Sequence, residues 1–496
     1  MNRPIQRVGI AVIVMIVMLL ANSTYVQVIK ADKLRNDSRN SRVLLDEYSR
    51  QRGAIVAADG TVLAESVATD NRFKYVRRYP TAPNAFAPVT GYFSYVYRAD
   101  RGLEQSEDGV LNGNDDRLFT QRFMDMFSGR DPRGGNVVTT IDPRLQIAAY
   151  KAMGQGQCDG PCRGAVVALE PSTGKILALV STPSYDPNTL ATQDFKSAEQ
   201  AWSELNRDDK PSPLENRAIT TLYPPGSTFK AVTTSTALKA GMPAGTRLTA
   251  AARIQLPDSN TYLPNDSGET CPNSSGGTVT MTQAFQYSCN TAFAQLMMDK
   301  VPGDPFQKFA DTAKQFGMDE DPAGIPMDVS KSTIGDLNND KAALGQAAIG
   351  QRDVRLTVLE NAMIAATVAN GGVRMRPYLV SKLQTADLRT ISTTAPSALN
   401  RPLTPEEADT LTDMMIRSEQ SMSNAQAGIA SKTGTAESGS RDVPYAWYIA
   451  FSPSSNPRIA VAVVIENGNR GANSYGGTIA APIGRAVMNA YAGGGR

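Results

Sequence analysis

The sequence predicts an α+β protein with an antiparallel sheet covered by helices, a smaller β-rich N-terminal stalk domain, and one N-terminal transmembrane helix. Three patterns predict this organisation. An apolar run lies near the N-terminus, and a polar, turn-rich stretch follows it. Beyond residue 140, strand-like runs lie at both ends of a region whose middle is helical. We expect domains at residues 1–29, 30–140 and 141–496.

The run from Val8 to Ala21 is apolar or small throughout, and Arg3 and Arg7 precede it. Basic residues before an apolar segment favour export of the chain that follows. The length of the run also fits a cleaved signal peptide. However, the apolar pattern resumes over Tyr25–Ile29, which makes the helix long enough to span a bilayer. We therefore expect an uncleaved, single-pass anchor in the cell membrane, with the rest of the chain, including the large domain, on the extracytoplasmic side.

The stalk, residues 30–140, is polar and rich in arginine and in turn residues. Residues 53–64 are typical of two short strands joined at Asp59-Gly60. A strand near residues 134–141 then runs into a helix that Asp142 can cap, with Pro143 in its first turn. The large domain is expected to begin here.

The large domain is predicted to begin and end with strands. Two strand-like runs, 164–170 and 175–182, are joined by a turn. Helical patterns then dominate, and they lie after Pro225 and over residues 280–300 and 356–369. Strands return at 446–451 and 458–465, before a last helix at 481–491. This order predicts one antiparallel sheet assembled from both ends of the domain.

The composition excludes several kinds of function. The sequence contains no histidine, which removes Ser-His-Asp and Cys-His mechanisms and every His-ligated zinc site. A general base must therefore be Lys, Asp, Glu, Tyr or a water. The formal net charge is +2 and no long run of one sign occurs, so no nucleic acid partner is expected. We expect no metal ion and no organic cofactor.

The four cysteines fit an oxidising compartment. Cys158 and Cys162 flank a short Asp-Gly-Pro loop that a disulfide can close, and Cys271 would then pair with Cys289. Four free thiols and a zinc site of poor spacing are the alternatives. Three pairings are formally possible, so the connectivity stays open.

Ser227 is the candidate nucleophile because of its setting. A Ser-x-x-Lys pattern arises by chance about twice in a chain of this length. The match at Ser172–Lys175 falls in the predicted hairpin turn, where nothing would hold the lysine against the hydroxyl. By contrast, Tyr-Pro-Pro-Gly precedes Ser227 and a helical pattern follows it. A helix start places Ser227 and Lys230 on one face, where a lysine of lowered pKa can take the serine proton.

The pattern Ser-x-Asn also has chance matches, at residues 38–40 and 454–456, but only Ser288-Cys289-Asn290 lies between the other motifs. In a locally extended loop, Ser288 and Asn290 would point the same way, with Cys289 turned away. Ser288 would then relay a proton, and Asn290 would bind a peptide group.

Lys432-Thr433-Gly434 heads a strand-like run that continues through Thr435 and Ala436. Gly434 has no side chain to block a substrate, and Lys432 supplies a cation. The hydroxyls of Thr433 and Thr435 suit a carboxylate. A substrate backbone can lie antiparallel along such a strand.

Taken in order, these motifs resemble the three signatures of the serine penicillin-recognising enzymes. The similarity extends over nearly the whole chain from residue 50, and the short layout resembles actinobacterial members of the class B penicillin-binding proteins. Further segments that resemble this class are Arg52–Ile55, Gly102–Glu104, Thr139–Asp142, Ala168–Lys175, Ile349–Gln351 and Ala369–Gly372. Residues 443–447 depart from the pattern, because Tyr445 stands where relatives often carry histidine.

The resemblance implies a transpeptidase domain of the penicillin-binding and serine β-lactamase fold, behind a dimerisation-like stalk. It implies that Lys230 deprotonates Ser227, which attacks the D-Ala-D-Ala carbonyl of a peptidoglycan stem peptide. An amine from a second stem peptide then completes the cross-link. The family's oxyanion hole corresponds to the backbone N–H groups of Ser227 and Thr435. The implied catalytic residues are Ser227, Lys230, Ser288, Asn290 and Lys432, and the implied binding residues are Thr433, Gly434 and Thr435.

The resemblance also implies partners. These are peptidoglycan stem peptides, β-lactam antibiotics, the membrane, a glycosyltransferase, and cell-division or elongation proteins. About 110 residues between anchor and domain are too few for a typical enzyme domain, which leaves glycan polymerisation to a partner.

Two other functions fit parts of the sequence. A D,D-carboxypeptidase or β-lactamase would resolve the acyl-enzyme with water, but a free β-lactamase needs no stalk. A non-catalytic β-lactam sensor would need a cytoplasmic signalling domain, and few residues precede Val8. A cell-wall scaffold would not need the full set of catalytic groups, all of which are present.

Overall fold

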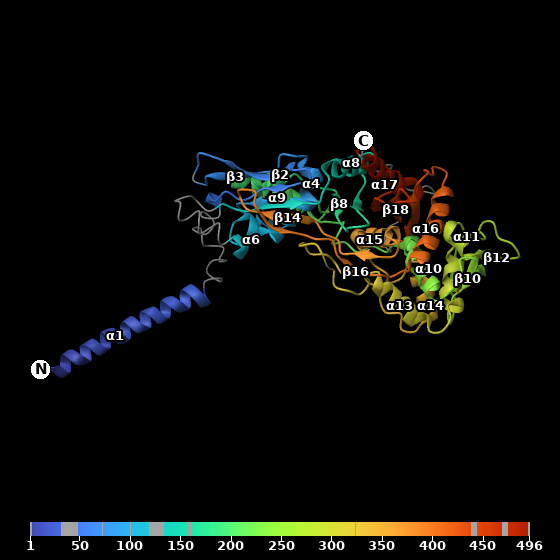
Figure 1. The fold of residues 1–496 in the computed structure, drawn as a ribbon, viewed down its shortest axis with the longest axis horizontal. Helices are drawn as coiled ribbons and strands as arrows, with labels where there is room; N and C mark the ends of the chain where they lie inside the picture. The colour runs from blue at the N-terminus through green and yellow to red at the C-terminus, as the bar shows by residue number, and fades with distance from the viewer. Residues whose placement is uncertain are drawn as a thin grey trace.

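The computed structural model describes residues 2–30, 48–71, 73–99, 101–118, 133–156, 158, 160–322, 324–437, 444–468 and 475–494. Figure 1 shows their arrangement. The N-terminal apolar run forms a helix, α1 (Asn2–Thr24), which continues as a π-helical turn, η1 (Tyr25–Ile29). Among the described segments, this is the one helix long and apolar enough to cross a bilayer. It confirms the predicted apolar helix and is compatible with a single-pass anchor.

A six-stranded sheet forms the N-terminal unit, with the strand order β15-β14-β6-β1-β2-β3. Strands β1 and β2 pair antiparallel across the predicted turn at Asp59-Gly60. Two members of the sheet come from much later in the chain, so the unit does not consist of N-terminal residues alone. The strands are β1 (Ile55–Val56), β2 (Val62–Ala68), β3 (Tyr75–Arg78), β6 (Asn136–Thr139), β14 (Val380–Gln384) and β15 (Thr390–Thr393).

A buried carboxylate, Glu104, holds the N-terminal unit together. It lies on the short helix α5 (Gly102–Ser106) and is fully buried. Its two oxygens accept hydrogen bonds from Nε of Arg52 and Nε of Arg77, both at 2.6 Å. Tyr79 adds a hydroxyl donor at 3.1 Å. Burial alone would raise the pKa of Glu104, but the two guanidinium groups outweigh burial and hold this pKa below its usual value.

The second sheet has five antiparallel strands in the order β17-β18-β19-β7-β8. It joins β7 and β8 from the start of the large domain to three strands from its end, which confirms the predicted organisation. The strands are β7 (Gly164–Leu169), β8 (Ile176–Thr182), β17 (Ala430–Ala436), β18 (Tyr445–Ser452) and β19 (Ile459–Ile465).

Helices cover both faces of this sheet, which is buried throughout its centre. Alternate residues of β18 enter two different hydrophobic cores. In the first core, Trp447, Ile449 and Phe451 pack with α15 (Val358–Ala369). The residues between them pack with α8 (Pro143–Gly154) and α17 (Gly476–Gly493). The two-residue period of a strand sends successive side chains to opposite faces, so one strand contributes to both cores. As predicted, Asp142 caps α8 by accepting the backbone N–H of Arg144 at 2.9 Å.

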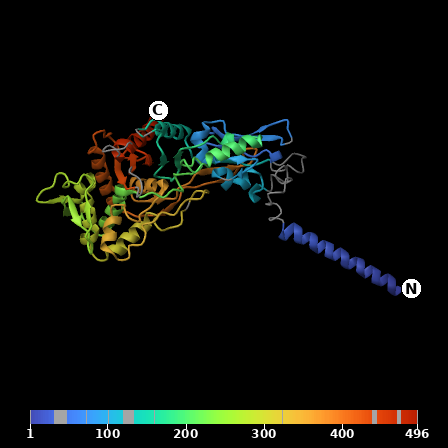
Figure 2. The same cartoon turned by 180° about the vertical axis from the view of Figure 1, so that it is seen from behind.

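The helical middle of the chain builds the rest of the molecule (Figure 2). Its first helix, α9 (Phe195–Leu205), lies against the N-terminal unit, where Trp202 stacks on Tyr97 with ring centroids 4.3 Å apart. Two small antiparallel sheets lie beyond the five-stranded sheet. One is the hairpin of β10 (Arg253–Gln255) and β11 (Tyr262–Pro264), and the other pairs β9 (Arg247–Thr249) with β12 (Thr278–Thr280). The remaining helices are α10 (Lys230–Lys239), α11 (Met281–Gln286), α12 (Asn290–Gln295), α13 (Pro305–Gln315), α14 (Lys341–Ala347) and α16 (Pro405–Gln420).

We predict that Glu104→Gln destabilises the N-terminal unit by about 3 kcal/mol or more, because it leaves two buried guanidinium groups without their counter-charge. The pKa of Glu104 is lowered on folding, so its stabilising contribution is present above the ordinary carboxyl pKa. That contribution is lost as the pH falls through the lowered value. Urea denaturation of native chain and variant at several pH values measures both effects.

The control for this prediction is Asp209→Asn, which removes an exposed ion pair with Arg207 and should leave the denaturation midpoint unchanged. Equal midpoints for the native chain and Glu104→Gln would contradict the role given to Glu104.

Candidate active site

Ser227 and Lys230 meet because the chain turns tightly before α10. Ser227 lies in a 3₁₀ turn, η4 (Gly226–Phe229), and Lys230 is the first residue of α10. In a 3₁₀ turn, residues three apart lie almost directly above one another. Lys230 Nζ accordingly lies 2.9 Å from Ser227 Oγ, and both side chains are buried. The predicted juxtaposition is therefore present, through a tighter turn than the α-helix start we expected.

Two glycines make this turn possible. Gly226 has φ +53°, a conformation that favours glycine, and its N–H donates to the carbonyl of Gly350 at 3.0 Å. A Cβ on Gly350 would lie 2.2 Å from the carbonyl oxygen of Gly226. The segment Ile349–Gln351, noted in the sequence without a role, therefore supports the backbone of the serine turn.

Ser288 and Asn290 both contact Lys230, but the loop that carries them is not extended, so that part of the prediction was wrong. Ser288 has φ +58°, and Asn290 begins α12. Lys230 Nζ lies 2.7 Å from the backbone oxygen of Ser288, 3.2 Å from its Oγ and 2.7 Å from Asn290 Oδ1. Ser288, in a left-handed conformation between α11 and α12, brings its own side chain and that of Asn290 to Lys230. We had expected an extended loop to do this.

The chemistry of these contacts suits a neutral Lys230. The Ser288 carbonyl and Asn290 Oδ1 can only accept hydrogen bonds. They engage the two N–H groups of a neutral amine, and the longer contact to Ser288 Oγ at 3.2 Å shares one of these N–H groups. Its lone pair then remains for the hydroxyl proton of Ser227. The geometry therefore provides a base aimed at the Ser227 hydroxyl.

Lys432 extends the hydrogen-bonded chain from the other side. Its Nζ donates to Ser288 Oγ at 2.9 Å and to the backbone oxygen of Thr433 at 2.9 Å. Lys432 is the third residue of β17, which begins at Ala430, so it does not head the strand as expected. Its side chain is fully buried rather than presented to solvent. Ser288 Oγ thus lies between the two lysines, as a relay would require.

The pKa values of both lysines are lowered from their ordinary values. Burial lowers the pKa of Lys230 well below its usual value, and the charge of Lys432 lowers it further, while Asp266 opposes both effects. Burial lowers the pKa of Lys432 to about 7, and Asp266 again opposes this. At neutral pH the pair therefore includes an amine able to accept a proton.

The remaining predicted residues lie along β17. Thr433 and Thr435 are partly exposed, while Gly434 is buried, and a Cβ on Gly434 would lie 2.7 Å from the Pro225 carbonyl oxygen. One edge of β17 pairs with β18, and in the described chain no strand pairs with the other edge. The strand lies against the serine turn, where a Cβ on Gly226 would be 2.6 Å from the Thr435 carbonyl oxygen. Its unpaired edge is therefore available to an extended ligand near Ser227.

The chance matches in the described part of the chain lie away from this site. Ser172 and Lys175 fall in the turn between β7 and β8, where Lys175 pairs with Glu170 at 3.4 Å. Residues 454–456 lie in a turn after β18, and residues 38–40 are outside the described part of the chain. Tyr445 packs edge-on against Tyr223 with centroids 5.3 Å apart, whereas residue 443 is outside the described part.

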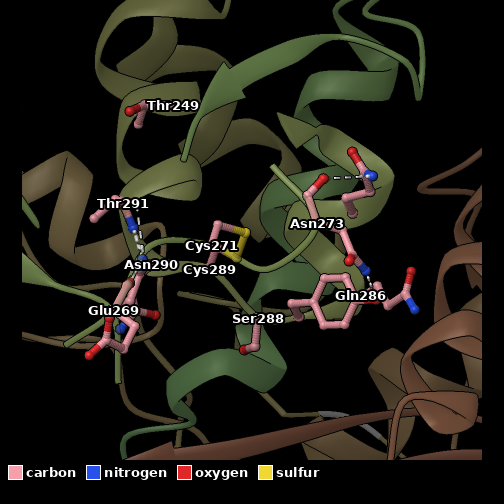
Figure 3. Close-up of a disulfide and its surroundings, with 12 residues drawn as sticks. Thr249, Glu269, Cys271, Asn273, Gln286, Ser288, Cys289, Asn290 and Thr291 are labelled. Carbon is pink, nitrogen blue, oxygen red and sulfur yellow. Dashed lines mark hydrogen bonds between the residues drawn. A yellow bond between two sulfur atoms is a disulfide. The ribbon is translucent and has the colours of Figure 1, made fainter. Parts of the chain in front are cut away.

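Both predicted disulfides are present, Cys158–Cys162 and Cys271–Cys289. Figure 3 shows the second one beside Ser288 and Asn290. It joins the loop that carries Ser288 and Asn290 to the segment that follows the β10–β11 hairpin. The disulfide therefore restrains the loop from which two of the Lys230 contacts come.

Three acidic residues of the site belong to none of the sequence motifs described above. Asp266 accepts a hydrogen bond from Asn290 Nδ2 at 2.8 Å. Glu419, buried behind β17, accepts hydrogen bonds from the hydroxyls of Ser431 and Tyr448. Glu466 accepts the hydroxyl of Tyr223, the residue at the start of the serine segment, at 2.6 Å. Within the described residues, no cluster of acidic and cysteine side chains is placed to hold a metal ion.

Comparison with known proteins identifies the family of the chain. Residues 164–489 match the family model of the penicillin-binding protein transpeptidase domain, and residues 52–137 match that of the penicillin-binding protein A dimerisation domain. The peptidoglycan D,D-transpeptidases PbpA of Mycolicibacterium smegmatis and Mycobacterium tuberculosis are 55% and 52% identical, over 99% of both chains in each case. The M. tuberculosis penicillin-binding protein A, solved as a ceftriaxone acyl-enzyme, superposes with a TM-score of 0.85 at 52% identity, covering 90% of this chain and 99% of that one.

We predict that Lys432→Met stabilises the protein near pH 7. The pKa of Lys432 falls from 10.5 to about 7 on folding, so between these values the unfolded chain binds a proton that the folded chain does not. Native stability therefore rises with pH across this window. The advantage of the variant should be largest near pH 7 and shrink toward pH 10.5, as measured by denaturation midpoints. The exposed Lys314→Met is the control, and an equal pH response in both variants would contradict the prediction.

We also predict that the double variant Cys271→Ser/Cys289→Ser lowers the free energy of unfolding by about 3 kcal/mol, the value expected for a loop of this length. The matched control, Cys158→Ser/Cys162→Ser, opens a separation of 4 residues in place of 18. It should lose less, about 2 kcal/mol. A larger loss in the control than in the first variant would argue against a loop-closure effect.

Proposed function

Because the chain belongs to the class B penicillin-binding proteins, we propose that it is a peptidoglycan D,D-transpeptidase whose acylated nucleophile is Ser227. The observation that carries this proposal is the continuous contact from Ser227 through Lys230 and Ser288 to Lys432. The substrate is a stem peptide ending in D-Ala-D-Ala, and β-lactams acylate the same serine. The acyl-enzyme structures of the M. tuberculosis relative with ceftriaxone and penicillin G support this assignment.

In the first half-reaction, neutral Lys230 takes the proton of Ser227 as Oγ attacks the carbonyl carbon of the penultimate D-Ala. The C–N bond of the tetrahedral intermediate then breaks, and the departing D-Ala nitrogen receives a proton from Lys230 or through Ser288. An ester on Ser227 and free D-Ala remain. In the second half-reaction the same groups take a proton from the acceptor amine, which attacks the ester, and return it to Ser227.

The oxyanion is held by the backbone N–H groups of Ser227 and Thr435, from the serine turn and from β17. The open edge of β17 binds the donor peptide as an added strand. The terminal carboxylate binds at the hydroxyls of Thr433 and Thr435. Gly434 keeps the strand close to the serine turn, because any side chain there would meet the Pro225 carbonyl.

The chain divides into an anchor over residues 1–29, a stalk over 30–140 and the transpeptidase domain over 141–496, from which β14 and β15 extend into the sheet of the stalk. The anchor is single-pass, and the domain lies on the extracytoplasmic side. Two disulfides in the structure fit an oxidising compartment. Because the stalk is too short for a glycosyltransferase domain, we assign glycan polymerisation to a separate partner. Cell-division or elongation proteins complete the assembly, which serves cell-wall synthesis during growth and division.

We predict that Ser227→Ala abolishes covalent labelling of the chain by a fluorescent penicillin, because the acylated oxygen is removed. Labelled protein on a denaturing gel is the measurement. Ser172→Ala, which changes the chance Ser-x-x-Lys match, is the control and should label like the native chain.

Equal labelling of the native chain and Ser227→Ala would refute the nucleophile. The lifetime of the label tests the reaction type, because a transpeptidase retains it. Rapid turnover of penicillin would instead indicate a β-lactamase.

A further inference from the structure

Asp266 is an exposed carboxylate at the edge of the active site. It follows β11 (Tyr262–Pro264), the second strand of the β10–β11 hairpin. Its Oδ1 accepts a hydrogen bond from Asn290 Nδ2 at 2.8 Å, and the backbone oxygen of Pro264 accepts one from the same nitrogen at 3.2 Å. Both N–H groups of the Asn290 amide are therefore directed at this segment.

These two acceptors determine which way the Asn290 amide faces. With Nδ2 toward Asp266 and Pro264, Oδ1 faces Lys230 at 2.7 Å. A flipped amide would place N–H groups against the Lys230 amine and an oxygen against two acceptors, so every contact would be lost. Asp266 is the side-chain partner that opposes the flip, and Pro264 contributes only its backbone.

The loop that carries Asp266 is firmly attached to the segment that carries Ser288 and Asn290. The neighbouring Asn265 is buried, donates to the backbone oxygens of Ala251 and Glu269, and accepts the N–H of Thr291 at 3.2 Å. The Cys271–Cys289 disulfide closes the other end of the same loop. Asp266 is thus an exposed side chain on a backbone that is fixed relative to Asn290.

Asp266 also contributes charge. The charged groups that act on Lys230 are Lys432, from β17, and Asp266, from this loop. Asp266 is likewise the group that opposes the lowering of the Lys432 pKa. Glu269, exposed on the same loop, is the carboxylate nearest to Asp266 in sequence. A single carboxylate therefore counters the positive charge of both buried lysines.

We propose that Asp266 is a positioning residue for acyl transfer: its carboxylate holds the Asn290 amide with Oδ1 toward Lys230. This inference rests on the proposed function and deepens it. Asp266 does not contact the reacting atoms, and it acts through Asn290 and through its charge on the two lysines.

The test compares Asp266→Ala and Asp266→Asn in the full-length chain, by the second-order rate of acylation with a fluorescent penicillin across a pH series. Asp266→Ala removes both the acceptor and the charge, and we expect acylation to slow about tenfold, as for a lost hydrogen bond to a group at the reaction centre. Asp266→Asn retains an acceptor oxygen, so its rate should return to within about threefold of the native rate.

The pH profile separates positioning from a merely structural role. Because Asp266 raises the pKa of Lys230, loss of its charge lowers that pKa. The acid limb of the acylation profile should therefore move to lower pH in both variants. The matched control is Asp258→Asn, which removes an exposed carboxylate in the turn of the same hairpin and should leave rate and profile unchanged.

An unchanged acid limb in both variants would overturn the proposal, as would equal rate losses in Asp266→Ala and Asp266→Asn. If Asp266→Ala fails to fold, the profile of Asp266→Asn alone decides between these outcomes. Ser227→Ala is run alongside. Labelling of that variant would refute the proposed function, whereas an inert Ser227→Ala with native-like Asp266 variants would refute only the role of Asp266.

Discussion

The structure depends most on the burial of two lysine amines around one serine hydroxyl. Lys230 and Lys432 are both fully buried, and both contact Ser288 Oγ. Two ammonium groups in such a place would repel each other and lose their hydration, which costs more than surrounding dipoles can return. Proton loss relieves this cost and leaves a base beside Ser227. In a chain without histidine, burial supplies the proton acceptor that histidine provides elsewhere.

Such a pair must be held rigidly, because small displacements would let water solvate the amines. The surrounding fold meets this requirement from each side. Behind β17, Glu419 binds Ser431, Tyr448 and Arg485, the last at 2.6 Å. Below the serine turn, Asn361 of α15 donates to Thr228 Oγ1 at 3.0 Å. These contacts are buried, and they anchor the serine turn to α15 and β17 to α16.

The sequence predicted the residues of the site better than the contacts that support them. Ser227, Lys230, Ser288, Asn290 and Lys432 were identifiable because their spacing and local structure limit what they can do, and the structure brings all five together. The left-handed conformation of Ser288 was not predicted, because nothing in Ser-Cys-Asn distinguishes it from an extended loop. Asp266 and Glu419 were missed for a different reason. Each is an ordinary acidic residue whose importance comes only from a partner distant in sequence, Asn290 or Tyr448.

Contacts between residues distant in sequence also explain why the sheet of the N-terminal unit was not fully predicted. It takes β14 and β15 from beyond residue 379. The two sheets meet at Thr140, whose hydroxyl donates to the backbone oxygen of Ile176 at 2.7 Å and also contacts that of Tyr378 at 3.1 Å. Ile176 begins β8 of the catalytic sheet, and Tyr378 precedes β14 of the N-terminal sheet. A rotation of one sheet against the other would break these buried hydrogen bonds at once, so the two sheets are joined as one framework. The N-terminal unit is thereby held in one orientation relative to the sheet whose edge strand carries Lys432.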